Sequence, residues 1–228
     1  YYINKADFVA CHNPSYILKG FPMVRDVKPG GVFLINCQWS DEELDKHMPA
    51  VAKRYIAEND IQVYTIDAID LAAKIGMGKR TNTILQSAFF SLANVMPQTE
   101  AIQYMKDAAT KSYSKKGEKI VAMNHAAIER GVSDVHKVEV PASWKDACAC
   151  DEKKLVTTDR KDLEQYVNNV LNPVNAYQGN KLPVSTFMPH VDGTAPQGSS
   201  AFEKRGIAVD VPEWNPQNCI QCNFCSYV

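Results

Sequence analysis

The sequence of 228 residues has little net charge and no long apolar run. Lysine and arginine together number 25, against 26 aspartate and glutamate residues, so the net charge is −1. This balance gives no electrostatic reason to expect binding to nucleic acid or to a membrane surface. The longest apolar run is too short for a transmembrane helix, and the amino-terminal residues lack the pattern of a signal peptide. The sequence therefore predicts neither a nucleic-acid partner nor a membrane partner.

Familiar catalytic signatures are also missing. The sequence has no recognisable Ser/His/Asp set, no paired-carboxylate site and no H-E-x-x-H motif. The 7 cysteines are an odd number in a long chain, which argues against a secreted disulfide framework. We therefore expect a protein of the reducing cytoplasm, in which no side chain of this chain performs covalent catalysis.

What the sequence does contain is an alternation of strand-like and helix-like segments in its first 140 residues. Strands are predicted over residues 7–11, 32–37, 61–66 and 137–140, and helices over residues 48–59, 67–76, 81–92, 99–113 and 118–130. Such alternation is typical of a parallel sheet with helices on its faces. We predict an α/β fold: an open, mostly parallel sheet with helices on both faces, in a three-layer, Rossmann-like arrangement.

Single residues set the expected helix ends. Ser40 and Glu43 have the spacing of a capping box, which we expect to open only a short turn. Asp67 and Thr99 are predicted to cap the helices that follow them. Gly131 is predicted to end the helix before it.

The composition changes after Pro141. Residues 142–158 are polar and charged, residues 159–171 fit one more helix, and residues 172–218 are rich in Pro, Gly and Ser. We expect the last of these to form an extended irregular arm. The predicted domains are residues 1–141 (an α/β domain), 142–213 (a helix and the connecting arm) and 214–228 (a cysteine segment).

The cysteine segment carries the sharpest motif. Cys219, Cys222 and Cys225 follow one another in a C-x₂-C-x₂-C pattern, and bacterial ferredoxins use this spacing to ligate an iron–sulfur cluster. The alternatives are a zinc knuckle, a redox pair or incidental thiols. Zinc would normally need a fourth Cys or His nearby, and none follows. The spacing therefore favours iron–sulfur ligation.

Several stretches together resemble one family. They include ADFVACHNPSYI, GGVFLINCQWS, GMGKRTNTILQSAFF and NCIQCNFC, in this order. The chain resembles an internal fragment of the pyruvate:ferredoxin (flavodoxin) oxidoreductases over nearly its whole length. The resemblance covers the γ-type domain, the connecting arm and the start of the two-cluster ferredoxin domain. It implies that the segment begins inside one domain, with a first βα unit upstream, and ends inside the next.

The resemblance implies an enzyme that oxidatively decarboxylates pyruvate to acetyl-CoA and CO₂. Electrons would pass through [4Fe–4S] clusters to ferredoxin or flavodoxin. Thiamine diphosphate and Mg²⁺ would be bound by other domains of the same polypeptide, and the full enzyme would be a homodimer. This segment would help to bind coenzyme A and would link to the iron–sulfur domain. The alternatives are a structural spacer without a ligand and a stand-alone iron–sulfur electron carrier.

Two loops hold candidate site residues, and the resemblance adds a limit on what the isolated chain can do. Lys79 and Arg80 follow glycines and precede a helix, where phosphates of coenzyme A would be favoured, and Arg80 and Asn82 match positions of the family that the chain resembles. The alternative is a helix–helix turn with solvated basic residues. His12 and Asn13 follow the first strand, at the edge where open α/β sheets bind ligands, and are candidates to contact a cofactor or a neighbouring domain. The alternative is a simple turn. In two-cluster ferredoxins the fourth cysteine of one run serves the other cluster. The isolated chain is therefore expected to hold no stable cluster and to be inactive.

Overall fold

The computed structural model describes residues 3–18, 20–148, 155–203 and 212–226. The strands are β1 (Ala6–Cys11), β2 (Val27–Asn36), β3 (Gln62–Ile66) and β4 (His136–Val138). The helices of the first body are α1 (Ser15–Leu18), α2 (Asp41–His47), α3 (Ala50–Glu58), α4 (Ala68–Ile75), α5 (Asn82–Leu92), α6 (Gln98–Tyr113) and α7 (Glu118–Ser133). The later part carries α8 (Lys161–Tyr166) and α9 (Asn172–Asn175).

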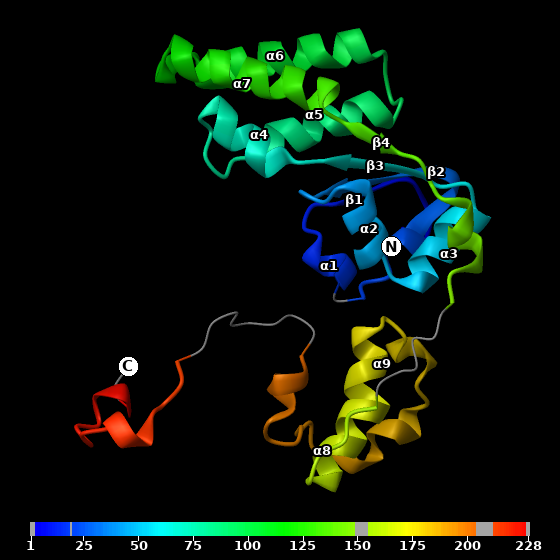
Figure 1. Ribbon diagram of the computed structural model, residues 1–228, viewed down its shortest axis with the longest axis vertical. Helices are drawn as coiled ribbons and strands as arrows, with labels where there is room; N and C mark the ends of the chain where they lie inside the picture. Colours follow the sequence, from blue (N-terminus) through cyan, green and yellow to red (C-terminus); the bar gives the residue numbers. More distant parts are fainter. Residues whose placement is uncertain (1–2, 19, 149–154, 204–211, 227–228) are drawn as a thin grey trace.

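The four described strands form one sheet in the order β1-β2-β3-β4. The first three strands are parallel, and β4 pairs antiparallel with β3. Figure 1 shows α1–α3 on one side of this sheet and α4–α7 on the other. The predicted open, mostly parallel sheet with helices on both faces is therefore confirmed.

Strand β2 explains why both faces are covered. Phe33 and Ile35 are fully buried in the core under α2 and α3, whereas Leu34 is buried in the second core under α4, α5 and α7. Successive strand residues point to opposite faces, so an unbroken apolar strand must bury both. This is the physical reason for the three-layer arrangement that the apolar runs predict.

Three helix ends differ from the sequence prediction. The Ser40 capping box is present, but it opens the full helix α2 instead of a short turn. Helix α6 begins at Gln98, directly after Pro97, and not after a Thr99 cap. Helix α7 runs through Gly131 to Ser133. A Cβ atom at Gly131 would lie 2.3 Å from the carbonyl oxygen of Ile84, so this glycine permits close packing of α7 on α5 and does not end the helix.

A buried tryptophan anchors the turn that follows β4 to the first body. Trp144, in the 3₁₀ turn Ala142–Asp146, is 2% exposed and belongs to the core beside α3. Its indole Nε1 donates a hydrogen bond of 2.6 Å to Asp45, and Lys53 pairs with the same carboxylate at 2.8 Å. The turn is thus packed onto the α/β body. The domain border at residue 141 stays a prediction.

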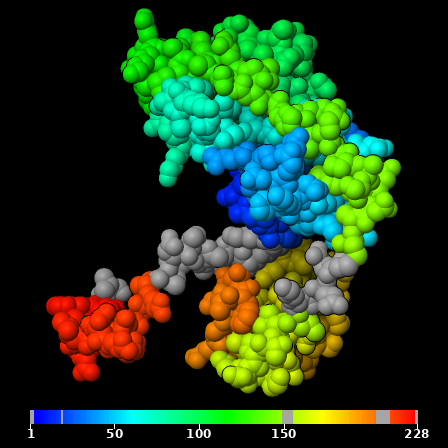
Figure 2. Space-filling view, in the orientation of Figure 1, coloured from blue at the N-terminus to red at the C-terminus, as the bar shows by residue number. Residues whose placement is uncertain are grey.

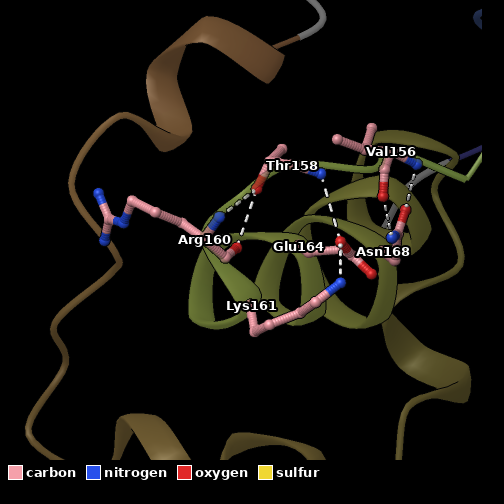
Figure 3. A network of polar contacts seen from close by, with 6 residues as sticks. All are labelled: Val156, Thr158, Arg160, Lys161, Glu164 and Asn168. Atoms are coloured by element: carbon pink, nitrogen blue, oxygen red, sulfur yellow. Dashed lines mark hydrogen bonds and ion pairs between the residues drawn. The ribbon is translucent and has the colours of Figure 1, made fainter.

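Residues 155–203 form a second body around one helical rod. The rod consists of α8, a π-helical segment (Val167–Leu171) and α9. Figure 3 shows how it holds an extended stretch of chain beside it. The Asn168 side chain bonds both the N–H and the C=O of Val156, and Glu164 accepts from the N–H of Thr158. Glu164 and Asn168 lie one helical turn apart on the rod, and Thr158 and Val156 lie two residues apart in the extended stretch. One helical turn and two extended residues cover similar distances, so each side chain meets one of these backbone positions.

The second body meets the first at an aromatic contact. The rings of Phe21 and Tyr177 lie 5.7 Å apart, centroid to centroid. In Figure 2 the second body forms a separate lobe, and the described carboxyl-terminal residues 212–226 stand apart from both bodies. No helix in the described ranges has the length and apolar character that a membrane span requires.

Candidate functional site

A crevice opens where the chain changes sides of the sheet. The chain leaves β2 toward α2 on one face, and it leaves β3 toward α4 on the other. Open α/β sheets bind ligands at such points, beside the carboxyl ends of the strands. The crevice has a volume of about 380 Å³. Its lining includes Trp39, Ser40, Asp41, Glu42, Thr65, Asp67, Asp134 and His136.

The crevice is acidic, and its helix starts are already capped. No lysine or arginine lines it within the part of the chain that the structure describes. Asp41 accepts a 3.0 Å hydrogen bond from His136, and Asp134 is paired with Arg130 just outside. The Ser40 hydroxyl accepts from the amide of Glu43 in the capping box. Carboxylates and occupied amides make this crevice unfavourable for phosphate.

One buried amide side chain, which the sequence analysis missed, joins the segments around the crevice. Asn36 is 4% exposed at the end of β2. Its Nδ2 donates to the carbonyl of His12, and its Oδ1 accepts from the amide of Ala68, each at 3.0 Å. Asn36 therefore ties the end of β1 to the start of α4. The signal that could have indicated it is a polar residue at the end of an otherwise apolar strand.

His12 and Asn13 lie exposed just after β1, at the same sheet edge. The Asn13 Oδ1 atom accepts a 3.0 Å hydrogen bond from the amide of Ser15, which starts α1. The Asn13 backbone carbonyl accepts from the Cys11 thiol at 3.1 Å. Asn13 thus shapes the turn, while the His12 side chain is turned to solvent. Their role as ligand contacts stays a prediction.

Lys79, Arg80 and Asn82 are exposed where α4 gives way to α5. Gly76 adopts a left-handed conformation (φ 89°) and ends α4, and the amide of Met77 bonds back to Ala72 at 2.8 Å. The loop is therefore built as a helix end, as the alternative interpretation expects. It still presents two cationic side chains beside the amino-terminal end of α5. Whether they bind phosphate stays a prediction.

A groove begins next to this loop and runs between α5, α6 and α7. It has a volume of about 360 Å³ and mixes apolar and polar side chains. Its lining includes Thr83, Gln86, Phe90, Tyr104, Met105 and Asn124. Thr83 directly follows Asn82 on α5, so one end of the groove lies next to a predicted site residue. The helical periodicity of α5 and α6 indicates these helices but not the groove between them.

The three cysteines of the tail carry features of a ligating loop. The amide of Gln221 donates to the Cys219 sulfur at 3.4 Å, and Gln221 and Asn223 have positive φ angles of 54° and 62°. The Trp214 side chain and then the Gln221 amide lower the pKa of Cys219. Cys222 and Cys225 are exposed. The donor types fit an iron–sulfur cluster, which ligates thiolates.

The placement of these thiols is not that of a closed metal site. Within the described ranges, no three His, Cys, Asp or Glu side chains are grouped so that they could hold a metal ion. The other two free cysteines of these ranges, Cys11 and Cys37, are buried in the α/β body. Burial raises the pKa of Cys11 to about 11 and also raises that of Cys37, so both remain thiols. They are core residues and not metal ligands.

Comparison with known proteins places the chain among named enzymes. A family model described as "Pyruvate ferredoxin/flavodoxin oxidoreductase" matches residues 1–133, and one described as "Domain of unknown function" matches residues 152–208. The chain is 49% identical to the pyruvate:ferredoxin oxidoreductase of Moorella thermoacetica and 45% identical to the pyruvate-flavodoxin oxidoreductase of Enterobacter agglomerans. Each match covers 100% of this chain and 19% of the relative.

The comparison also gives two more distant matches. A pyruvate dehydrogenase [NADP(+)] of Cryptosporidium parvum is 39% identical over all of this chain and 13% of its own length. A crystal structure of the pyruvate oxidoreductase subunit PORC of Thermotoga maritima is 17% identical, with a TM-score of 0.47, and covers 60% of this chain and 67% of that one. The chain thus spans about a fifth of the length of the first two relatives. Because the family model matches more than half of the chain, the chain belongs to the pyruvate ferredoxin/flavodoxin oxidoreductase family.

Proposed function

We propose that this chain works as the coenzyme A-associated segment of an enzyme that converts pyruvate and coenzyme A to acetyl-CoA and CO₂ with electron transfer to ferredoxin or flavodoxin. The observation that carries the proposal is the end-to-end match to relatives bearing the names pyruvate:ferredoxin and pyruvate-flavodoxin oxidoreductase. Thiamine diphosphate and Mg²⁺ would be held by other parts of the polypeptide. The two-electron chemistry would depend on those groups and on iron–sulfur clusters.

The region at the start of α5 supports the coenzyme A part of the proposal. Lys79 and Arg80 are exposed cations, and coenzyme A carries several phosphate charges. The neighbouring groove offers both apolar surface and polar groups, such as Gln86 and Asn124. A pantetheine chain has the same mixed character, since its methylenes alternate with amides. The chain would thereby fix the position of the coenzyme A thiol, and positioning alone can lower a reaction barrier considerably.

The second body and the tail would connect this segment to the iron–sulfur domain. Cys219, Cys222 and Cys225 would supply three thiolates to one [4Fe–4S] cluster, and the fourth would come from sequence beyond this chain. The Gln221 amide bonded to the Cys219 sulfur would help to hold that thiolate. The proposed roles of the chain are thus binding and connection. No acid, base or nucleophile of its own is required.

The decisive experiment is steady-state kinetics on the full-length enzyme with Arg80→Gln and Asn82→Ala. Losing a charge-assisted hydrogen bond to phosphate should raise KM for coenzyme A about tenfold, while KM for pyruvate stays unchanged. Arg25→Gln is the matched control, because Arg25 is also exposed but lies before β2. Wild-type coenzyme A kinetics in both variants would favour the alternative, a structural spacer that binds no nucleotide at these residues.

A further inference from the structure

We propose that the acidic crevice between β2 and β3 is a receptor for an arginine side chain from a polypeptide segment outside these 228 residues. The crevice is separate from the α5 region invoked for coenzyme A. Its location at the point where the connections switch faces is one at which open α/β sheets take up ligands. The inference goes beyond the proposed function, because it concerns a protein contact and not the substrate.

The charge of the residues that line the crevice indicates the sign of the charge on its ligand. Asp41, Glu42, Asp67 and Asp134 all line the crevice, and no described lysine or arginine does. Asp67 uses its Oδ1 to cap α4 through the amide of Asp70 at 2.9 Å, and its second oxygen takes no part in that cap. The ligand is therefore a cation. No described group of three His, Cys, Asp or Glu side chains forms a metal site, so the cation is an organic one.

A buried hydroxyl provides an independent sign that the crevice accepts a ligand. Thr65 lines the crevice and is only 6% exposed. Within the described part of the chain, the Thr65 hydroxyl makes no hydrogen bond. Every side-chain N or O atom there that is completely buried does have a hydrogen-bond partner, so the Thr65 oxygen cannot be completely buried. The Thr65 oxygen must therefore reach the open space of the crevice. A hydroxyl in this position offers an acceptor to an incoming N–H donor.

An arginine fits this set better than a lysine. The guanidinium group is planar, carries five N–H donors and stacks on aromatic rings. The crevice offers carboxylate oxygens, the Thr65 hydroxyl and the ring of Trp39. A volume of about 380 Å³ holds such a side chain with accompanying water. The relatives are about five times longer than this chain, so ample polypeptide exists to provide the arginine.

The test is a titration of the ¹⁵N-labelled 228-residue chain with N-acetyl-arginine amide, followed by NMR. We expect shifts of the Thr65, Asp67 and His136 amides. Asp67→Asn keeps a helix-capping residue but removes the charge, and it should weaken binding about tenfold. Thr65→Val keeps the β-branched shape without the hydroxyl and should weaken binding severalfold. Asp107→Asn on α6 removes a charge outside the crevice and should leave binding unchanged.

Neutral N-acetyl-citrulline amide has nearly the same shape and tests the charge requirement. The proposal requires that it shift these amides much less than the arginine probe does. It is overturned if the arginine probe shifts no crevice amide, if citrulline matches arginine, or if Asp107→Asn weakens binding as much as Asp67→Asn. Preserved ¹⁵N spectra of each variant show that folding is intact. The coenzyme A kinetics of the Arg80 variants do not depend on any of these outcomes.

Discussion

At the scale of single residues, Gly131 shows how one missing side chain determines a packing distance. Helices α5 and α7 approach so closely that a Cβ atom at Gly131 would meet the Ile84 carbonyl oxygen at 2.3 Å and the Ser87 Cβ at 2.9 Å. Ser87 in turn donates a 2.6 Å hydrogen bond to the carbonyl of Ile128. Because the obstacle at Gly131 includes backbone, it cannot move aside as a flexible side chain can. Small residues on both helices therefore hold the second core together.

We expect Gly131→Ala to destabilise the chain by about 2 kcal/mol, the usual cost of overpacking a core. The measurement is urea unfolding followed by circular dichroism. Gly179→Ala is the control, since its nearest contact would be an ordinary 3.4 Å to Val174. That variant should be neutral or slightly stabilising. Equal stability of the Gly131 variant and the wild type would contradict the packing described for α5 and α7.

At the scale of elements, the second body depends on an ionised carboxylate. Glu164 accepts from Lys161 and from the amide of Thr158, and these contacts, Lys161 first, lower its pKa. A lowered folded-state pKa means that the stabilisation is present above the ordinary Glu pKa and is lost as the pH falls through the folded value. Acidification below about pH 4.3, the ordinary value, should therefore release the extended stretch from the rod.

The measurement is hydrogen exchange of the Thr158 amide across this pH range, corrected for intrinsic rates. Protection should fall on acidification in the wild type. In Glu164→Gln the protection should be lower throughout and independent of pH. Asn168, which holds Val156 through an uncharged amide, provides the internal comparison, since the protection of Val156 should change far less. A Thr158 amide whose protection is constant with pH in the wild type would rule out this role for Glu164.

The elements also show what the sequence could and could not predict. The apolar run of β1 and the Asp67 cap of α4 were predicted closely, because their signals are local. Helix α2 differs from the predicted short turn: Pro49 suits the first turn of the next helix, but it does not prevent a separate helix before it. The sequence of α2, DEELDKH, gives little apolar signal, since it is mostly charged and only Leu44 is buried. The crevice was not predicted at all. It forms because the connections after β2 and β3 run on opposite faces of the sheet, which local sequence patterns do not show. In the sequence, Thr65 is an ordinary residue of a predicted strand.

At the scale of the whole molecule, truncating the chain before or after the 3₁₀ turn at Trp144 tests where the first body ends. We expect residues 1–147 alone to fold, and residues 1–141 to be less stable by about 3 kcal/mol or more, the usual cost of losing a large buried aromatic side chain. Thermal unfolding of the two truncated chains measures the difference. Within the 1–147 chain, Trp144→Ala should reproduce most of the loss. Equal stability of the two lengths would support the border predicted after Pro141.

The tail gives a second test at this scale. Three thiolates cannot complete a four-ligand cluster, so the 228-residue chain should retain far fewer than four irons after anaerobic reconstitution. Iron and sulfide assays measure this directly. A chain extended to include downstream cysteines is the positive control. About four irons per unextended chain would contradict the need for an outside ligand.

The antiparallel direction of β4 has a consequence for how this body can sit in a larger protein. The start of β1 and the end of β4 both lie at the amino edge of the parallel strands. These two points therefore lie on the same side of the sheet. The opposite rim holds the crevice, and neither of these two points lies on it.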